Sequence, residues 1–164
     1  MNVIAALAAL LLATSLRAAQ FSAYDGSFSL AAADRWKDCG VKTFEHSKKK
    51  PALCLMEPSS GSAPPTLLIL DIAFNQGYKP GAPLEDIARR DLAMRRKKKP
   101  GAKSTPVKPV RFRTGLDGFG FGMQYGDRGW DTFYFALGPK RYTATCRGDR
   151  EKDCLTALAT IRSR

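Results

Sequence analysis

An apolar run near the N-terminus is the feature that most constrains what this chain can fold into. Residues 3–16 read VIAALAALLLATSL and contain no charged side chain. A permanent transmembrane helix needs about 20 such residues, whereas a shorter run suits the core of a secretory signal peptide. Small residues follow at Ala18 and Ala19. We therefore expect residues 1–19 to be removed and residues 20–164 to act outside the cytoplasm, in a periplasm or as a secreted protein.

Two features of this leader are unusual. No Lys or Arg precedes the apolar run, and Arg17 lies close to the expected cleavage site. A buried N-terminal helix is the alternative, but a helix on the surface of a soluble domain needs only one apolar stripe, and this run is apolar on every face. No second long apolar stretch follows. We expect a mature chain without a transmembrane segment.

The length and the cysteines indicate one disulfide-stabilised domain. Residues 20–164 are enough for a single core and too few for two ordinary domains. An even number of cysteines in an exported chain argues for disulfides, and closeness in sequence favours Cys39 with Cys54 and Cys146 with Cys154. Zinc ligands usually stand two to four residues apart, which these cysteines do not. We expect neither a metal nor another cofactor.

Basic residues are numerous and unevenly placed. The chain has 27 Lys and Arg against 15 Asp and Glu, and a dense group lies within positions 89–108. Its first members are Arg89, Arg90, Arg95, Arg96, Lys97, Lys98 and Lys99. Such charge blocks attract polyanions, which outside the cytoplasm include anionic envelope lipid, lipopolysaccharide, acidic polysaccharide and nucleic acid. The alternative is a solvated segment, which the lack of an aromatic residue within positions 89–108 favours, because nothing there could stack on a base or sugar.

The apolar periodicity predicts an α+β fold. Segments of alternating or continuous apolar residues bounded by turn residues indicate strands at 24–30, 41–44, 52–56, 66–74, 107–114, 118–125, 130–137 and 140–146. A helix begins near Pro83, with acidic residues in its first turn, and stops at Pro100; a second helix covers 150–163. Positions 98–109 have the composition of a long basic loop. We expect an antiparallel sheet of about six or seven strands with two helices packed on one face.

One predicted strand carries glycine at every second position. Residues two apart share a face of a strand, so Gly118, Gly120 and Gly122 form a bare backbone face opposite large apolar side chains. Because glycine weakens strands, three in alternation need a reason. Close approach of a ligand or partner, tight helix packing and strong local twist are the alternatives. We take the three glycines as a candidate ligand face.

Three stretches of the chain form a recognisable set. They are the opening 24–30 with Arg35 and Trp36, the acidic helix start 83–86, and the final strand 142–146 with a helix ending at 161–163. Together they resemble the PsbP-like superfamily, which includes extrinsic photosystem II subunits and many exported bacterial proteins. The resemblance covers nearly all of the mature chain. The superfamily shares no catalytic motif, so no residue role is carried over, and its members mostly bind or assemble with partners. By analogy the resemblance implies a protein that is not an enzyme.

A search for catalytic groups finds little. His46 is the sole histidine and lies beside a lysine run, and no nucleophile elbow, phosphate loop or dinucleotide fingerprint is present. We therefore predict a non-catalytic exported binding or assembly module for an unidentified protein or small ligand. The alternatives are a binder of polyanions or anionic membrane surfaces through 89–108, and a hydrolase whose carboxylates meet only in the fold.

Overall fold

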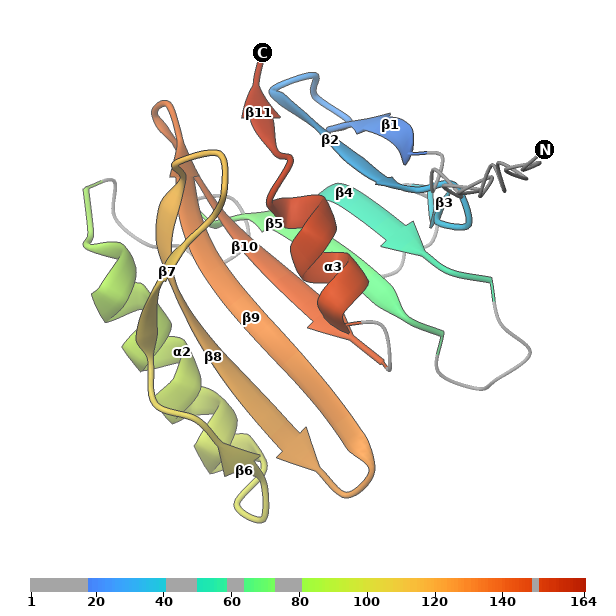
Figure 1. Ribbon diagram of the computed structural model, residues 1–164. Coiled ribbons are helices and arrows are strands. Elements are labelled where there is room, and N and C mark those ends of the chain that lie inside the picture. The colour runs from blue at the N-terminus through green and yellow to red at the C-terminus, as the bar shows by residue number, and fades with distance from the viewer. Residues whose placement is uncertain (1–17, 41–49, 59–63, 73–80, 149–150) are drawn as a thin grey trace, which may run out of the picture.

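The computed structural model describes residues 18–40, 50–58, 64–72, 81–148 and 151–164, which form two sheets and two helices (Figure 1). The class is α+β, as the sequence predicts. The described strands outnumber the six or seven expected, because the main sheet alone has eight and a small second sheet adds three. The predicted strand 41–44 and His46 lie outside the described residues.

The main sheet is antiparallel throughout and carries most of the fold. In spatial order its strands are β3 (Lys37–Asp38), β4 (Pro51–Met56), β5 (Thr66–Asp71), β10 (Lys140–Arg147), β9 (Arg128–Leu137), β8 (Asp117–Tyr125) and then β6 (Lys103–Ser104) with β7 (Lys108–Arg111). The long strands β10, β9 and β8 pair with one another over most of their lengths. β6 and β7 both pair with β8, as successive segments along its outer edge.

A small sheet joins the two ends of the described chain. Its order is β1 (Ala18–Ser22), β2 (Phe28–Ala33) and β11 (Arg162–Ser163). The predicted opening strand is therefore shifted, because residues 24–27 form a turn and the strand runs from Phe28 to Ala33. Ala18 and Ala19 pair with β2, so cleavage of the leader after Ala19, which stays a prediction, would shorten β1.

The two helices cover opposite faces of the main sheet, and the prediction of one shared face is wrong. Successive side chains along a strand point to opposite faces of the sheet. Phe133 of β9 packs in the core cluster that includes α3 (Glu151–Leu158), whereas its neighbour Tyr134 packs in the cluster that includes α2 (Leu84–Lys98). Figure 1 shows α3 in front of β10 and α2 running along β8. A sheet with apolar side chains on both faces must be covered twice.

Other element boundaries follow the sequence closely, with two exceptions. α2 begins at Leu84, directly after Pro83, with Glu85 and Asp86 in its first turn and basic residues in its last. The C-terminal helix stops at Leu158 rather than near 163, because the chain then continues into β11. The predicted loop 98–109 contains β6 and the start of β7. No described helix is long and apolar enough to span a membrane.

Both disulfides favoured by the cysteine spacing are present. Cys39 is bonded to Cys54 at the β3–β4 edge of the main sheet, and Cys146 of β10 is bonded to Cys154 of α3. The described part of the chain has no free cysteine. On the loop-entropy account such short bridges contribute roughly 2.5–3 kcal/mol each. The second bridge fixes α3 on the core face of the sheet.

Candidate functional site

The glycine face of β8 is covered by residues of the neighbouring strand β9. Gly118 and Gly120 are buried. A Cβ atom on Gly120 would lie 2.8 Å from Cδ1 of Phe133, and one on Gly118 would collide with the carbonyl oxygen of Tyr134. Phe112 covers Phe133 edge-on, with ring centroids 6.0 Å apart. Gly120 therefore makes room for the ring of Phe133, and Gly118 makes room for the backbone at Tyr134.

The space beside Gly122 is also taken up, by Thr105 and Asp131. Its N–H donates to Oγ1 of Thr105 over 2.8 Å, and its carbonyl oxygen accepts the Thr105 N–H over 3.0 Å. A Cβ atom at this position would lie 2.6 Å from Oδ1 of Asp131. Of the alternatives for the glycine face, this geometry favours close packing within the fold over contact with a ligand.

The basic residues of 89–108 have different surroundings, because some of them form ion pairs within the fold. Arg89 pairs with Glu85 one turn earlier, and Nε of Arg89 donates to it over 3.0 Å. Arg95 turns toward the sheet, where its Nε donates to Oδ2 of Asp91 over 2.9 Å. The guanidinium carbon of Arg95 also lies 5.6 Å from the ring centroid of Phe121. Arg95 is thus a residue that holds α2 in place.

Asp91 is the centre of this helix anchor. It is buried, and it accepts a hydrogen bond from the hydroxyl of Tyr134 as well as the bonds from Arg95. Arg95 reaches further to Oγ1 of Thr132 over 3.3 Å. A buried ion pair of this kind stabilises little by itself, but removing one partner is costly. The anchor fixes the end of α2 relative to β9.

The exposed basic residues gather on the last turns of α2. Arg90, Lys97 and Lys98 are exposed, and Arg96 is exposed with its Nε donating to Oγ of Ser104 over 2.9 Å. Residues three and four apart lie on one side of a helix. Met94, which is 49% exposed, therefore shares a side of α2 with Arg90, Lys97 and Lys98.

Two aromatic side chains meet the end of this helix. The ammonium of Lys99 lies 5.2 Å from the ring centroid of Tyr125 and 5.1 Å from that of Trp130. Tyr125 ends β8 and is half-exposed, and Trp130 follows near the start of β9. In Figure 1 the end of α2, β6 and the β8–β9 turn lie together at the lower end of the molecule.

We call this region the basic–aromatic end, and it comprises Arg90, Met94, Arg96, Lys97, Lys98, Lys99, Tyr125 and Trp130. Its aromatic part was not predicted from the sequence, because no aromatic residue lies within positions 89–108. The two rings come from a hairpin further along the chain, and no local sequence pattern shows that the hairpin lies beside the helix.

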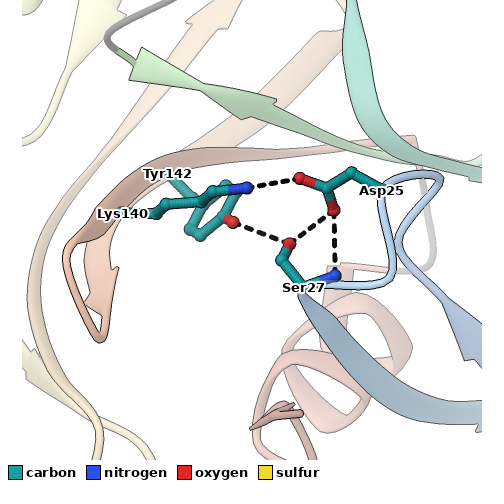
Figure 2. Close-up of polar contacts among 4 residues, drawn as sticks. All are labelled: Asp25, Ser27, Lys140 and Tyr142. Carbon is teal, nitrogen blue, oxygen red and sulfur yellow. Dashed lines mark hydrogen bonds and ion pairs between the residues drawn. The ribbon is translucent and has the colours of Figure 1, made fainter.

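A second polar cluster lies between the small sheet and the main sheet (Figure 2). Oγ of Ser27 lies 2.6 Å from Oδ1 of Asp25 and 2.8 Å from the hydroxyl of Tyr142, and Nζ of Lys140 lies 2.6 Å from Oδ2 of Asp25. The contacts join the turn before β2 to the start of β10.

The protonation states of this cluster do not suit catalysis. The hydrogen bond from Lys140, helped by Ser27, lowers the pKa of Asp25 to about 2. The same bond raises the pKa of Lys140, and burial raises the pKa of Tyr142. An effective general base has a pKa near the working pH. None of these groups has a pKa shifted toward neutral pH, and their contacts tie the turn before β2 to the start of β10.

Comparison with solved structures identifies the fold. The solution structure of PsbP from the cyanobacterium Synechocystis sp. PCC 6803 superimposes with a TM-score of 0.60 over 91% of this chain and 94% of that chain, at 11% identity. The chain has the PsbP-like fold. A Pseudomonas aeruginosa protein of unknown function matches with a TM-score of 0.54 over 88% of this chain and 95% of that one, at 17% identity. Identities this low show the fold alone.

Comparison by sequence finds no relative of the chain. No family profile matches it, and no curated protein matches it significantly.

Two of the residues on which the sequence resemblance is based have roles in packing the fold. Trp36 is 2% exposed in the core, and Arg35 beside it bridges Glu57, over 3.3 Å, and Asp153 of α3. Within the described ranges, no three His, Cys, Asp or Glu side chains could hold a metal together.

Proposed function

We propose that this protein is an exported, non-catalytic binding module that holds a polyanionic ligand at its basic–aromatic end. The observation that carries the proposal is the contact of the exposed Lys99 with the rings of Tyr125 and Trp130, at the end of a helix that presents further Arg and Lys side chains to solvent. Export is supported by the two disulfides, because such bonds persist in oxidising compartments. Fold-level analogy to PsbP-like proteins supports binding rather than catalysis.

The basic–aromatic end is a better ligand site than the glycine face. Gly118 and Gly120 are covered by β9, so a ligand there would have to displace packed rings. The basic–aromatic end instead presents charge to solvent. The lack of nearby rings favoured a merely solvated segment, and the fold removes that reason because Tyr125 and Trp130 lie against Lys99.

The absence of an activated nucleophile in the Ser27 cluster supports the non-catalytic part of the proposal. Its carboxylate has a pKa of about 2 and its lysine stays protonated, so neither can accept a proton at neutral pH. A hydrolase built on other carboxylates stays an alternative. Turnover of generic ester, glycoside or phosphoester substrates by the purified mature protein would support it and refute our proposal.

Salt-dependent retention on heparin tests the binding function. Exposed charge pairs are screened over about 8–10 Å at physiological ionic strength, so elution should shift strongly with salt. We expect neutralisation of three exposed residues, Arg90→Gln, Lys97→Gln and Lys98→Gln, to release the protein at clearly lower salt. Arg95 is left intact because it pairs with Asp91, and its substitution would disturb the fold.

A matched variant separates a local site from net charge. Lys152, Arg162 and Arg164 are exposed and lie on α3 and the C-terminal strand, away from α2. Replacing all three by Gln removes the same charge. If this control lowers the elution salt as much as the α2 variant does, the basic–aromatic end is not the binding site and the proposal is refuted.

A further inference from the structure

We propose that the polyanion is an anionic lipid bilayer, and that Met94 and Tyr125 enter its headgroup region while the surrounding lysines contact lipid phosphates. This deepens the proposed function and rests on it. The starting observation is the distribution of exposed apolar side chains. Among the described residues, the large exposed hydrophobic side chains are Met94 and Tyr125, at 49% and 50% exposure. Both belong to the basic–aromatic end.

The combination of residue types matches a membrane interface. Tyr and Trp side chains concentrate at the level of lipid headgroups, because one end of each ring system is apolar and the other is polar. Lysine can lay its aliphatic stem along apolar surface and keep its ammonium in water. The ammonium of Lys99 itself lies over the rings of Tyr125 and Trp130. Exposed methionine adds apolar contact beside Lys97 and Lys98, which a polysaccharide ligand does not require.

Stacking of nucleic acid bases fits this arrangement less well. A base needs an open ring face on which to stack. The ammonium of Lys99 lies over the rings of both Tyr125 and Trp130, so it occupies one face of each. The exposed half of Tyr125 therefore suits insertion among lipid headgroups better than stacking.

The shape of the molecule allows such docking without hindrance. In Figure 1 the end of α2 and the β8–β9 turn lie at one end, whereas the small sheet and the C-terminus lie at the other. The helix anchor at Asp91 and the contact of Lys99 with the hairpin hold the two elements together. An anionic surface at this end of the molecule would therefore meet the end of α2 and the β8–β9 turn together.

The magnitude follows from the two contributions. Each basic residue close to an anionic leaflet strengthens partitioning roughly fivefold. Interfacial affinity also rises with the buried apolar area. Removing two half-exposed apolar side chains should weaken vesicle binding by roughly tenfold, while removing none of the charge.

Vesicle binding by the mature protein tests this inference. We expect binding to vesicles of mixed phosphatidylglycerol and phosphatidylcholine, and none to pure phosphatidylcholine. Met94→Gln with Tyr125→Ser should lower the affinity for these vesicles roughly tenfold. The matched control, Met94→Leu with Tyr125→Phe, keeps the apolar area and should bind as the unaltered protein does.

Tryptophan fluorescence supplies a second readout. Trp36 is buried in the core, whereas Trp130 lies at the docking surface, so quenching by brominated lipids should come from Trp130 and disappear in Trp130→Phe. Heparin retention without vesicle binding would overturn lipid docking and leave the proposed function standing. Vesicle binding that ignores the Met94 and Tyr125 substitutions would overturn the insertion. A mature protein that neither binds these vesicles nor is retained on heparin would refute the proposed function itself.

Discussion

Placing a methyl group on the glycine strand tests whether its bare face is closed. In Gly120→Ala the new Cβ would lie 2.8 Å and 3.0 Å from two carbons of the Phe133 ring and 3.2 Å from a backbone oxygen of Thr132. Ordinary contacts begin near 3.5 Å, so the ring or the strand must shift. In Gly118→Ala the obstacle is the carbonyl oxygen of Tyr134, which cannot rotate away as a side chain can.

The expected cost is the difference between two opposing effects. Overpacking a filled site costs about 1–3 kcal/mol, whereas replacing glycine by alanine in a strand returns about 0.5–1 kcal/mol. We expect Gly120→Ala to lower the free energy of unfolding by about 1–2 kcal/mol. Gly118→Ala should cost more because its obstacle is backbone. Gly129→Ala is the control, because a Cβ there meets no atom within 4 Å.

Urea unfolding of the oxidised mature domain measures these differences. For a domain of this size each kcal/mol shifts the thermal midpoint by roughly 2–4 °C, so melting curves provide an independent check. Gly129→Ala should be neutral or slightly stabilising. If Gly118→Ala and Gly120→Ala prove as stable as this control, the face is open, our packing argument is wrong, and the glycine face becomes a ligand surface again.

Two further predictions concern the polar clusters. The folded-state pKa of Asp25, about 2, lies below the usual carboxyl value near 3.9. Its contribution to the free energy of unfolding is therefore present above about pH 4 and is lost as the pH falls toward 2. Acid unfolding of Asp25→Asn should lack that part of the pH dependence. Asp91→Ala leaves Arg95 and the Tyr134 hydroxyl without their shared acceptor and should cost about 3 kcal/mol in urea unfolding. Glu85→Ala, which breaks an exposed pair on the same helix, should cost under about 1 kcal/mol, and equal losses would refute the anchor.

Local signals predicted the elements that depend on local chemistry. The start of α2 follows from proline and acidic residues at its first turn, and its stop from Pro100. The disulfides follow from short spacings, since nearby cysteines close small loops. These features need no knowledge of which strand lies beside which. The longer strands β8, β9 and β10 were placed well for the same reason.

Features that depend on distant partners could not be predicted. Phe133, Tyr134 and Phe135 are all apolar, so the pattern of β9 does not say which face each helix covers. β6 is a short basic edge strand, typical of loops in composition, and only its pairing with β8 makes it a strand, whereas β7 lies within the predicted strand 107–114. The reason for the glycines was equally hidden, because the rings that fill their face come from β9.

The basic–aromatic end depends on all of these long-range features at once. Tyr125 stands at the end of β8 because the hairpin pairs it with Arg128, and Phe133 of β9 packs against Gly120 of β8. The Asp91 anchor holds α2 against β9, which places Lys99 at the end of the helix over the two rings. A substitution that loosens either contact should therefore weaken ligand binding without touching the ligand. Reduced vesicle affinity in Gly120→Ala, measured well below its unfolding temperature, would be the sign of that coupling, and unchanged affinity would show that the surface charges act without it.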